Sequence, residues 1–164
     1  MSEAGERTGP ARRRPADSRT ELAELVMPQH ANILGKVFGG TILSLVDKAA
    51  ACAAIRHAGR TCVTAQVDQV AFLAPIEIGE LVRLVATVTW VGRSSMEVGV
   101  DVHAMDIRAG TQRLTNTCYV TMVAIDEAGR PAPVPELSLE TEAERALFAA
   151  GAERARARRE MRRS

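Results

Sequence analysis

An isolated carboxylate, Asp47, lies in the apolar segment FGGTILSLVDKAA, which spans Phe38–Ala50. The spacing of apolar residues predicts a helix, and a buried carboxylate on a helix is costly unless it is paired or hydrogen-bonded. Two interpretations stay open from this segment alone. Asp47 and Lys48 mark a polar strip that faces solvent, or Asp47 is an acid placed to react with a ligand.

Two glycines at the start of the segment favour the second interpretation. Gly39 and Gly40 stand where a helix leaves backbone N–H groups unpaired and where its dipole favours negative charge. Because they carry no side chains, a ligand carbonyl can approach these N–H groups and be polarised, as an oxyanion site requires. Asn32, in the preceding loop, offers an amide that can position a water molecule.

A second polar cluster lies in the sequence VGRSS. It contains Arg93, Ser94 and Ser95, a cationic and hydroxyl-rich corner suited to a phosphate. A glycine pair or a hairpin turn is a weak signal by itself. Taken with Asn32 and Asp47, the two clusters predict an anionic ligand that carries a reactive carbonyl.

The elements that must position these residues follow from the spacing of apolar side chains. A short strand, a glycine-containing loop and an alanine-rich helix come first, at residues 20–26, 27–40 and 41–58. Alternating apolar residues then predict four antiparallel strands, near residues 63–72, 82–90, 96–103 and 111–125. The alternation slips near Asp68 and Gln69, which predicts a β-bulge there. This order predicts an α+β domain in which the sheet wraps around the helix.

Both ends of the chain differ in composition from this central part. Residues 1–20 are rich in Arg, Pro, Gly and Ser, which predicts a disordered basic tail. Residues 21–136 form the predicted domain, and residues 137–164 are predicted to be a C-terminal helical extension. We interpret its basic end, ERARARREMRRS, as solvated or frayed, with contact to RNA or another anionic surface as the alternative.

The bulk composition argues against several classes of protein. The 164 residues carry a net charge of +1, which gives no overall drive toward nucleic acid or membrane. Three scattered cysteines, Cys52, Cys62 and Cys118, are expected to be small buried residues in a reducing compartment. They show no metal-ligand spacing, and no apolar run suits a membrane span or a signal peptide. We therefore expect a cytoplasmic protein without a metal site.

Three separated blocks of the chain resemble the hotdog-fold acyl-CoA thioesterases. The blocks are NILGKVFGGTILSLVDKAA, TCVTAQVDQVAFLAPIEIGE and VGRSSMEVGVDV, and the resemblance covers about Glu21–Asp126. It is to the group that contains the bacterial YciA-like enzymes and the cytosolic long-chain acyl-CoA hydrolases. The resemblance implies a hotdog fold, an antiparallel β-sheet wrapped around a central α-helix, which agrees with the order of elements above.

The resemblance also implies roles for the residues in these blocks. Asn32 of one subunit is expected to face Asp47 of another across a dimer interface, and Asp47 acts as general base or as nucleophile. The amide N–H at or near Gly40 stabilises the oxyanion, and Asp68 supports the site. The CoA nucleotide is expected to lie against Arg93, Ser94 and Ser95.

The implied reaction is hydrolysis of acyl-CoA to a free carboxylic acid and CoA, without metal or redox cofactor. The implied assembly is a homodimer that often forms a trimer of dimers, a hexamer. Two alternatives stay open. One is a non-catalytic acyl-CoA-binding module or regulator. The other is a hotdog dehydratase or hydratase, which uses a histidine beside an acid, whereas the predicted helix carries no histidine before His57.

Overall fold

The computed structural model of the chain describes residues 12–68 and 70–164. Five antiparallel strands form one sheet in the order β2-β4-β5-β6-β3. They are β2 (Thr20–Leu25), β3 (Cys62–Asp68), β4 (Leu81–Val91), β5 (Ser95–Asp106) and β6 (Thr111–Ala124). Because β3 pairs only with β6, it forms one edge of the sheet.

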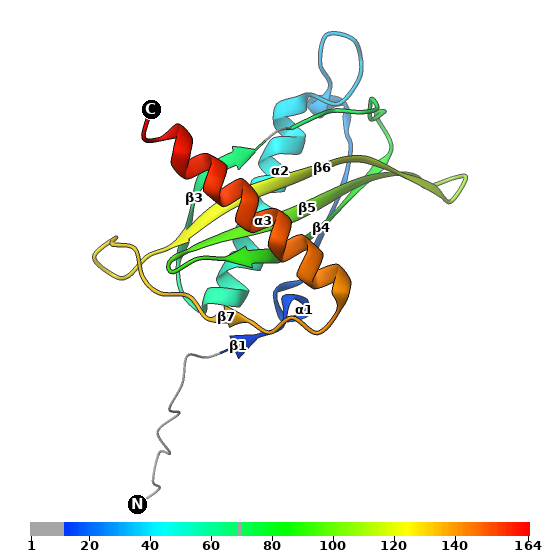
Figure 1. Ribbon diagram of the computed structural model, residues 1–164. Coiled ribbons are helices and arrows are strands. Elements are labelled where there is room, and N and C mark those ends of the chain that lie inside the picture. Colours follow the sequence, from blue (N-terminus) through cyan, green and yellow to red (C-terminus); the bar gives the residue numbers. More distant parts are fainter. Residues whose placement is uncertain (1–11, 69) are drawn as a thin grey trace, which may run out of the picture.

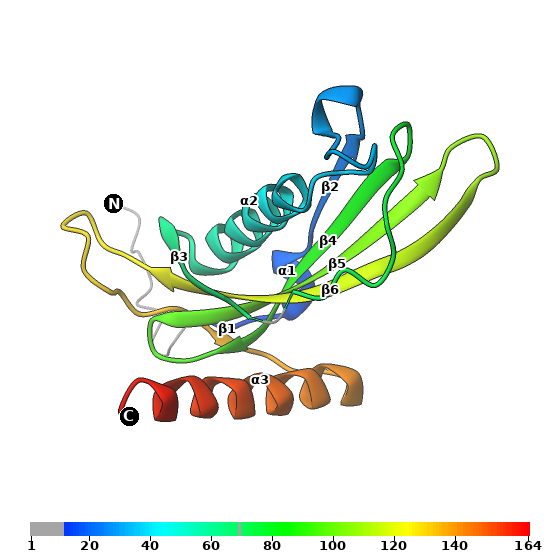
Figure 2. The ribbon, with the colours of Figure 1, turned by 90° about the horizontal axis from the view of Figure 1, so that it is seen from above.

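Two long helices lie on opposite faces of this sheet, as Figures 1 and 2 show: α2 (Gly39–Ala58) and α3 (Glu142–Met161). We call the face under α2 the inner face and the face under α3 the outer face. The shorter elements are β1 (Arg12–Arg13), α1 (Pro15–Ser18), the 3₁₀ turn η1 (Pro28–His30) and β7 (Glu136–Leu137). The predicted α+β hotdog architecture with an added C-terminal helix is confirmed. No helix within the described ranges is long and apolar enough to cross a bilayer.

The inner face carries the apolar core. Alternate residues of β4, β5 and β6 point to α2 and are 0% exposed: Val82, Leu84, Ala86, Val88, Met96, Val98, Val100, Val102, Ala104, Cys118, Val120, Met122 and Ala124. Opposite them, α2 buries Ile42 and Val46 and then a run of alanines that includes Ala49, Ala50, Ala53 and Ala54. These small side chains let the backbone of α2 lie close to the curved sheet.

The outer face holds α3 by a close backbone approach and by buried charge. A Cβ added to Gly151 would lie 2.6 Å from the Cβ of Trp90, so glycine is required for this contact. Glu97 on β5 is 0% exposed and accepts two hydrogen bonds from Arg154, at 3.0 and 2.7 Å. Arg158 is 7% exposed. The expectation that this basic segment is solvated or frayed is therefore wrong, because two of its arginines are paired beneath α3.

The predicted N-terminal tail is also shorter than expected. Residues 12–20 include β1, which pairs with β7, and the single turn α1. Ser18 is 0% exposed, and its hydroxyl donates to the Pro15 carbonyl at 2.7 Å and accepts from the Val88 N–H at 2.9 Å. A polar composition is compatible with order here because the buried hydroxyl has partners. The rest of the predicted tail, residues 1–11, lies outside the described residues.

A register shift lies in β3, though not where the sequence predicted it. The shift falls between Thr64 and Gln66, and Gln69 lies outside the described residues. Thr64 pairs with Met122, an inner-face residue, whereas Gln66 pairs with Thr121 on the outer face. The bulge thus gives one strand polar side chains on both faces of the sheet.

Candidate active site

Asp47 lies on an exposed side of α2, next to the edge strand β3. It is exposed in the single chain, as are Ser44, Lys48 and Cys52 on the same side. The carboxylate therefore keeps its hydration, which removes the desolvation cost that its sequence context suggested. Asp47 and Lys48 form no ion pair with one another.

Thr64 orients this acid, and sequence reasoning did not find it. Its hydroxyl Oγ1 lies 2.5 Å from Asp47 Oδ1 and donates a hydrogen bond to it. Only one carboxylate oxygen is used in this contact, which leaves Oδ2 available to a ligand or to water. Thr64 reaches Asp47 because the bulge follows it, so no regular alternation of β3 could have indicated the pairing.

The start of α2 presents unpaired N–H groups. Phe38 occupies the N-cap position and its side chain makes no capping hydrogen bond. The first N–H groups of the helix, at Gly39 and Gly40, therefore have no acceptor from a cap. A Cβ on Gly39 would meet the ring of Phe72 at 3.4 Å and one on Gly40 would lie 2.9 Å from the ring of Phe38, so two aromatic side chains border this helix start.

Asn32 lies in the loop that leads to this helix start. Its Oδ1 accepts hydrogen bonds from the N–H groups of Leu34, at 2.8 Å, and Lys36, at 3.2 Å. The side-chain carbonyl is thus used to shape the loop, and the side-chain NH₂ remains as a donor. Asn32 and Gly39 line one cavity of about 400 Å³, whose apolar wall includes Leu34, Phe72 and Leu73.

Asp47 is well separated from this cavity within one chain. It lies eight residues beyond Gly39 on α2, a distance of about 12 Å along the helix axis at 1.5 Å per residue. No hydrogen bond joins Asn32 to Asp47 in the described parts of the chain. One subunit therefore carries two half-sites, Asn32 with the helix start and Asp47 with Thr64.

The turn between β4 and β5 lies apart from both half-sites. Its backbone is fixed by hydrogen bonds from Gly92 N–H to the Ser95 carbonyl, at 2.8 Å, and from Ala124 N–H to the Ser94 carbonyl, at 2.9 Å. Arg93 and Ser95 line a cavity of about 370 Å³ that is shared with α3. The predicted phosphate corner is therefore associated with the outer face of the sheet.

Asp68 also belongs to the outer face. Its carboxylate accepts hydrogen bonds from Gln66, at 2.5 Å, and from Arg158 on α3, at 2.6 Å. The expectation that Asp68 supports the site finds no direct contact with Asp47, because the partners of Asp68 are Gln66 and Arg158. Its link to the site runs through β3, which also carries Thr64.

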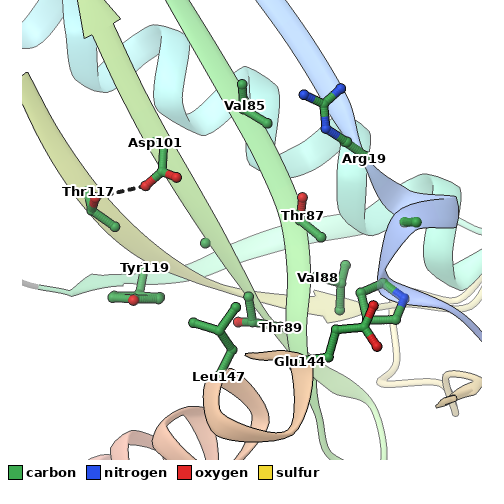
Figure 3. A pocket seen from close by; sticks show the side chains of 13 residues that line it. Arg19, Val85, Thr87, Val88, Thr89, Asp101, Thr117, Tyr119, Glu144 and Leu147 are labelled. Carbon is green, nitrogen blue, oxygen red and sulfur yellow. Dashed lines mark hydrogen bonds between the residues drawn. The ribbon is translucent and has the colours of Figure 1, made fainter. Parts of the chain in front are cut away.

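A further cavity of the outer face, of about 320 Å³, contains no residue singled out from the sequence (Figure 3). It lies between α1, the sheet and the first turns of α3, where Val85 and Leu147 contribute apolar surface. Its carboxylate Asp101 accepts a hydrogen bond from Thr117 at 2.8 Å, drawn as a dashed line in Figure 3.

The histidines and cysteines supply no obvious catalytic group. His57 is 0% exposed, its Nε2 lies 2.7 Å from the Pro135 carbonyl, and burial lowers its pKa. His30 Nδ1 accepts from the Met27 N–H at 3.0 Å and so shapes the loop. Burial raises the pKa of Cys62 to about 11, whereas Cys52 is exposed, contrary to expectation. Among the described residues no group of His, Cys, Asp or Glu side chains could hold a metal ion.

Comparison with known proteins identifies the family of the chain. Residues 34–111 match the family model for the thioesterase superfamily. The chain is 40% identical over 147 residues to an uncharacterized acyl-CoA thioester hydrolase of Bacillus subtilis, and the match covers 90% of this chain and 86% of that protein.

Two solved structures are similar over nearly the whole chain. An apo-hexameric acyl-CoA thioesterase has 38% sequence identity and a TM-score of 0.88, covering 92% of this chain and 97% of its own. The acyl-CoA hydrolase of Staphylococcus aureus in complex with butyryl-CoA, CoA and CoA disulfide has 35% identity and a TM-score of 0.84, with 92% of both chains covered. That hydrolase has also been solved with an asparagine, an aspartate or a threonine replaced by alanine.

The level of identity over most of both chains settles the family. Both solved structures share the fold of this chain, as their TM-scores of 0.88 and 0.84 show. The chain belongs to the thioesterase superfamily, among the hotdog-fold relatives of the acyl-CoA thioester hydrolases.

Proposed function

We propose that the protein hydrolyses acyl-CoA to a carboxylic acid and CoA, with Asp47 as the reacting acid. The single observation that carries this proposal is the hydrogen bond from Thr64 to one oxygen of an exposed, otherwise unpaired carboxylate. A side chain held in one orientation, with its second oxygen free, suits attack on a carbonyl or activation of water.

The chemistry then follows from the groups present. In one route Asp47 takes a proton from water, the resulting hydroxide attacks the thioester carbonyl, and CoA leaves as the thiolate. In the other route the Asp47 carboxylate attacks, expels CoA and forms a mixed anhydride, which water then hydrolyses. In both routes the N–H groups at Gly39 and Gly40, with the amide NH₂ of Asn32, stabilise the charge on the carbonyl oxygen. Both routes consume one water molecule and no other reactant, so the proposed reaction uses no cofactor.

The separation of the half-sites supports a site shared between two subunits. Asn32 with the helix start comes from one copy and Asp47 with Thr64 comes from its partner. The side of α2 around Asp47 exposes apolar residues that a partner would cover, including Leu43 at 37% and Ile55 at 44%. In the Asn32 loop, Ile33 is 101% exposed, as expected for a side chain that becomes buried on assembly.

The free edge of the sheet supplies a way for two copies to pair. The edge strand β3 exposes Val63, at 44%, and Val67, at 41%, and an unpaired edge strand readily adds a second strand. We propose that such dimers assemble further as a trimer of dimers, because similar thioesterases are hexameric. We assign the thioesterase domain to residues 21–136 and the helical extension to residues 137–164, and we place the protein in the cytoplasm.

Hydrolysis assays on acyl-CoAs of short, medium and long chains test this function. Asp47→Ala is expected to lower kcat at least about a hundredfold while the protein still folds and binds CoA, since Asp47 is exposed. Glu127→Ala, an exposed acid outside the site, serves as control and should keep full activity. Turnover near the wild-type level in Asp47→Ala would contradict the proposed role of this acid. CoA binding without turnover of any chain length by the wild type would favour the binding-module alternative.

The burial of His57 argues against the dehydratase alternative. A dehydratase needs a histidine that reaches the substrate, and His57 is fully buried against Pro135 at the far end of α2.

A further inference from the structure

The strand that carries Thr64, β3, has few buried contacts of its own. It is an edge strand, and of its seven residues only Cys62 is buried. Its ladder with β6 is interrupted at the bulge, where Ala65 has no partner residue. A segment with few buried contacts opens easily, so the position of Thr64 depends on the side-chain contacts that the strand makes.

Side chains on the two sides of the bulge connect β3 to two different helices. Before the bulge, Thr64 Oγ1 donates to Asp47 Oδ1 on α2, at 2.5 Å. After the bulge, Gln66 Nε2 donates to Asp68 Oδ1 at 2.5 Å, and Asp68 Oδ2 accepts from Arg158 Nη1 on α3 at 2.6 Å. Figure 1 shows the C-terminal part of α3 beside β3. The bulge therefore lies between a hydrogen bond on the inner face and an ion pair on the outer face.

Arg158 is itself held firmly. Its side chain is 8% exposed, and its Nη1 also donates to Glu97 Oε2, at 3.3 Å. Glu97 in turn accepts from Arg154 at 2.7 and 3.0 Å. Because a buried charge that loses its partner is costly, this network resists displacement of Arg158. Arg154 provides a matched comparison, since it shares Glu97 with Arg158 but forms no hydrogen bond with Asp68 in the described parts of the chain.

We infer that Arg158, on the C-terminal helix, is a positioning residue for the reacting acid. Through Asp68 and Gln66 it fixes the residues that follow the bulge, and this holds the Thr64 hydroxyl against Asp47 on the opposite face. The helix α3 thus helps to arrange the active site as well as covering the sheet. The role rests on the proposed function, because it takes Asp47 as the reacting acid.

Kinetics of Arg158→Met and Arg154→Met test this role. Both variants remove one partner of Glu97, but only Arg158→Met releases Asp68. We expect kcat for acyl-CoA hydrolysis to fall at least about fivefold in Arg158→Met, because a displaced acid reacts poorly. Arg154→Met should keep the wild-type kcat, although both variants lower the melting temperature.

The KM for acyl-CoA separates positioning from substrate contact, because Arg158 also lines a cavity with Arg93. A positioning residue leaves the KM of Arg158→Met within about twofold of the wild-type value, whereas loss of a substrate contact raises it. A raised KM with unchanged kcat, or an equal fall of kcat in Arg158→Met and Arg154→Met, would overturn the inference.

Asp68→Asn breaks the same link with less disturbance of α3. Asparagine has the shape of aspartate, and Arg158 keeps Glu97 as a partner. The new NH₂ group must face the amide NH₂ of Gln66 or the guanidinium of Arg158, and all of these groups are donors. We expect kcat to fall at least about threefold while the protein stays folded. A wild-type kcat in folded Asp68→Asn would contradict the link.

Thr64→Val shows whether the effect of Arg158 passes through Thr64. Alone it should lower kcat at least about tenfold, because a hydrogen bond to a charged carboxylate is lost. In that background, adding Arg158→Met should lower kcat by less than about a further twofold, since the contact that Arg158 supports is already gone. A general loosening of the fold would instead lower kcat equally in both backgrounds, and that result would exclude the proposed role.

Amide hydrogen–deuterium exchange reads the same link without catalysis. Exchange in Cys62–Asp68 should be faster in Arg158→Met than in Arg154→Met or in the wild type, because β3 loses its outer-face contact. Equal exchange in the two variants would overturn the inference. If the wild type hydrolyses no acyl-CoA, the proposed function fails, and the exchange result still decides whether Arg158 holds the bulge.

Discussion

The two faces of the sheet hold their helices by different physical means. On the inner face, α2 packs through alanine, valine and leucine side chains that are 0% exposed. On the outer face, α3 depends on Gly151 against Trp90 and on the ion pairs of Glu97 and Asp68 with Arg154 and Arg158. Arg154 also lies over the ring of Tyr119, 3.7 Å from its centroid.

This difference matters for function because apolar packing tolerates small displacements of a helix, whereas a buried ion pair does not. Area burial has no directional requirement, so the inner face supports α2 while leaving an exposed side of the helix, beside β3, free to present Asp47. The buried ion pairs of the outer face fix α3 in one position, since a displaced guanidinium would leave Glu97 unpaired. Three sets of measurements, in order of decreasing expected change in stability, test how each helix is held and what its buried side chains contribute.

Glu97→Ala should give the largest loss of stability. It leaves the part-buried Arg154 without its carboxylate partner and leaves the buried Arg158 with Asp68 alone, and removing one partner of a buried ion pair costs about 3–5 kcal/mol. The chain has a single tryptophan, and Trp90 packs under α3, so its fluorescence should report loosening of that helix. Urea denaturation followed at Trp90 and by circular dichroism measures both effects.

The matched change on the inner face is Leu84→Ala. It should cost about 2–5 kcal/mol through the cavity it leaves, with the native Trp90 spectrum unchanged. A loss below about 1 kcal/mol in Glu97→Ala, or an unchanged Trp90 spectrum in that variant, would contradict the role given to the ion pairs.

Gly151→Ala should have a smaller effect on stability. It should destabilise the protein, although this change usually stabilises a helix. Alanine normally stabilises a helix interior by about 1 kcal/mol relative to glycine. Here the new Cβ would lie 2.6 Å from the Cβ of Trp90, so α3 must move off the sheet, at a cost of about 1–3 kcal/mol. The melting temperature should fall, while Glu153→Ala, at an exposed position of the same helix, should leave it near the wild-type value. A rise in melting temperature for Gly151→Ala would mean that the close contact does not hold α3.

The smallest effect concerns His57, the titratable side chain buried at the end of α2. Burial is the main reason that its folded pKa lies below 6.5, its value in the unfolded chain. Because the unfolded state binds the proton more readily, the contribution of His57 to stability is present above pH 6.5 and decreases as the pH falls below it. The slope is at most about 1.4 kcal/mol per pH unit for one proton.

Chemical denaturation between pH 7 and pH 5 should show this slope, and His57→Gln should reduce it. The range ends at pH 5 because carboxylates such as Asp17 and Glu21, whose folded pKa values are lowered from 3.8 and 4.5 by arginine partners, lose their contribution only at lower pH. An identical slope in the wild type and in His57→Gln would show that another group is responsible.

The sequence predicted those parts of the molecule whose signal is local. Alternation in β4, β5 and β6 and the alanine-rich spacing of α2 indicate the inner face, because each strand alone shows which residues face the core. The glycine pair likewise indicates an open helix start, since that property depends on neighbouring residues only. The fold class and the candidates Asn32 and Asp47 come from such local signals and from the family resemblance.

The outer face could not be predicted because its contacts join distant parts of the chain. Arg158 resembles the solvated arginines around it, but it is buried through its pairing with two distant acids, Asp68, 90 residues away, and Glu97. Thr64 was missed for a related reason, since the bulge after it decides which face its hydroxyl reaches. Ser18 shows the same principle at the N-terminus, where a hydroxyl is buried because Val88 supplies a donor.

The most direct test of the central claim, a site shared between Asn32 of one subunit and Asp47 of another, is complementation between two inactive variants. Asp47→Ala and Asn32→Ala are each expected to be nearly inactive alone. After equal mixing, unfolding and refolding together, half of randomly formed dimers are mixed, and each mixed dimer holds one intact site out of two. The account predicts recovery of about a quarter of wild-type activity. No recovery, in mixtures shown by mass spectrometry to contain mixed dimers, would contradict it and place both residues in a site within one chain.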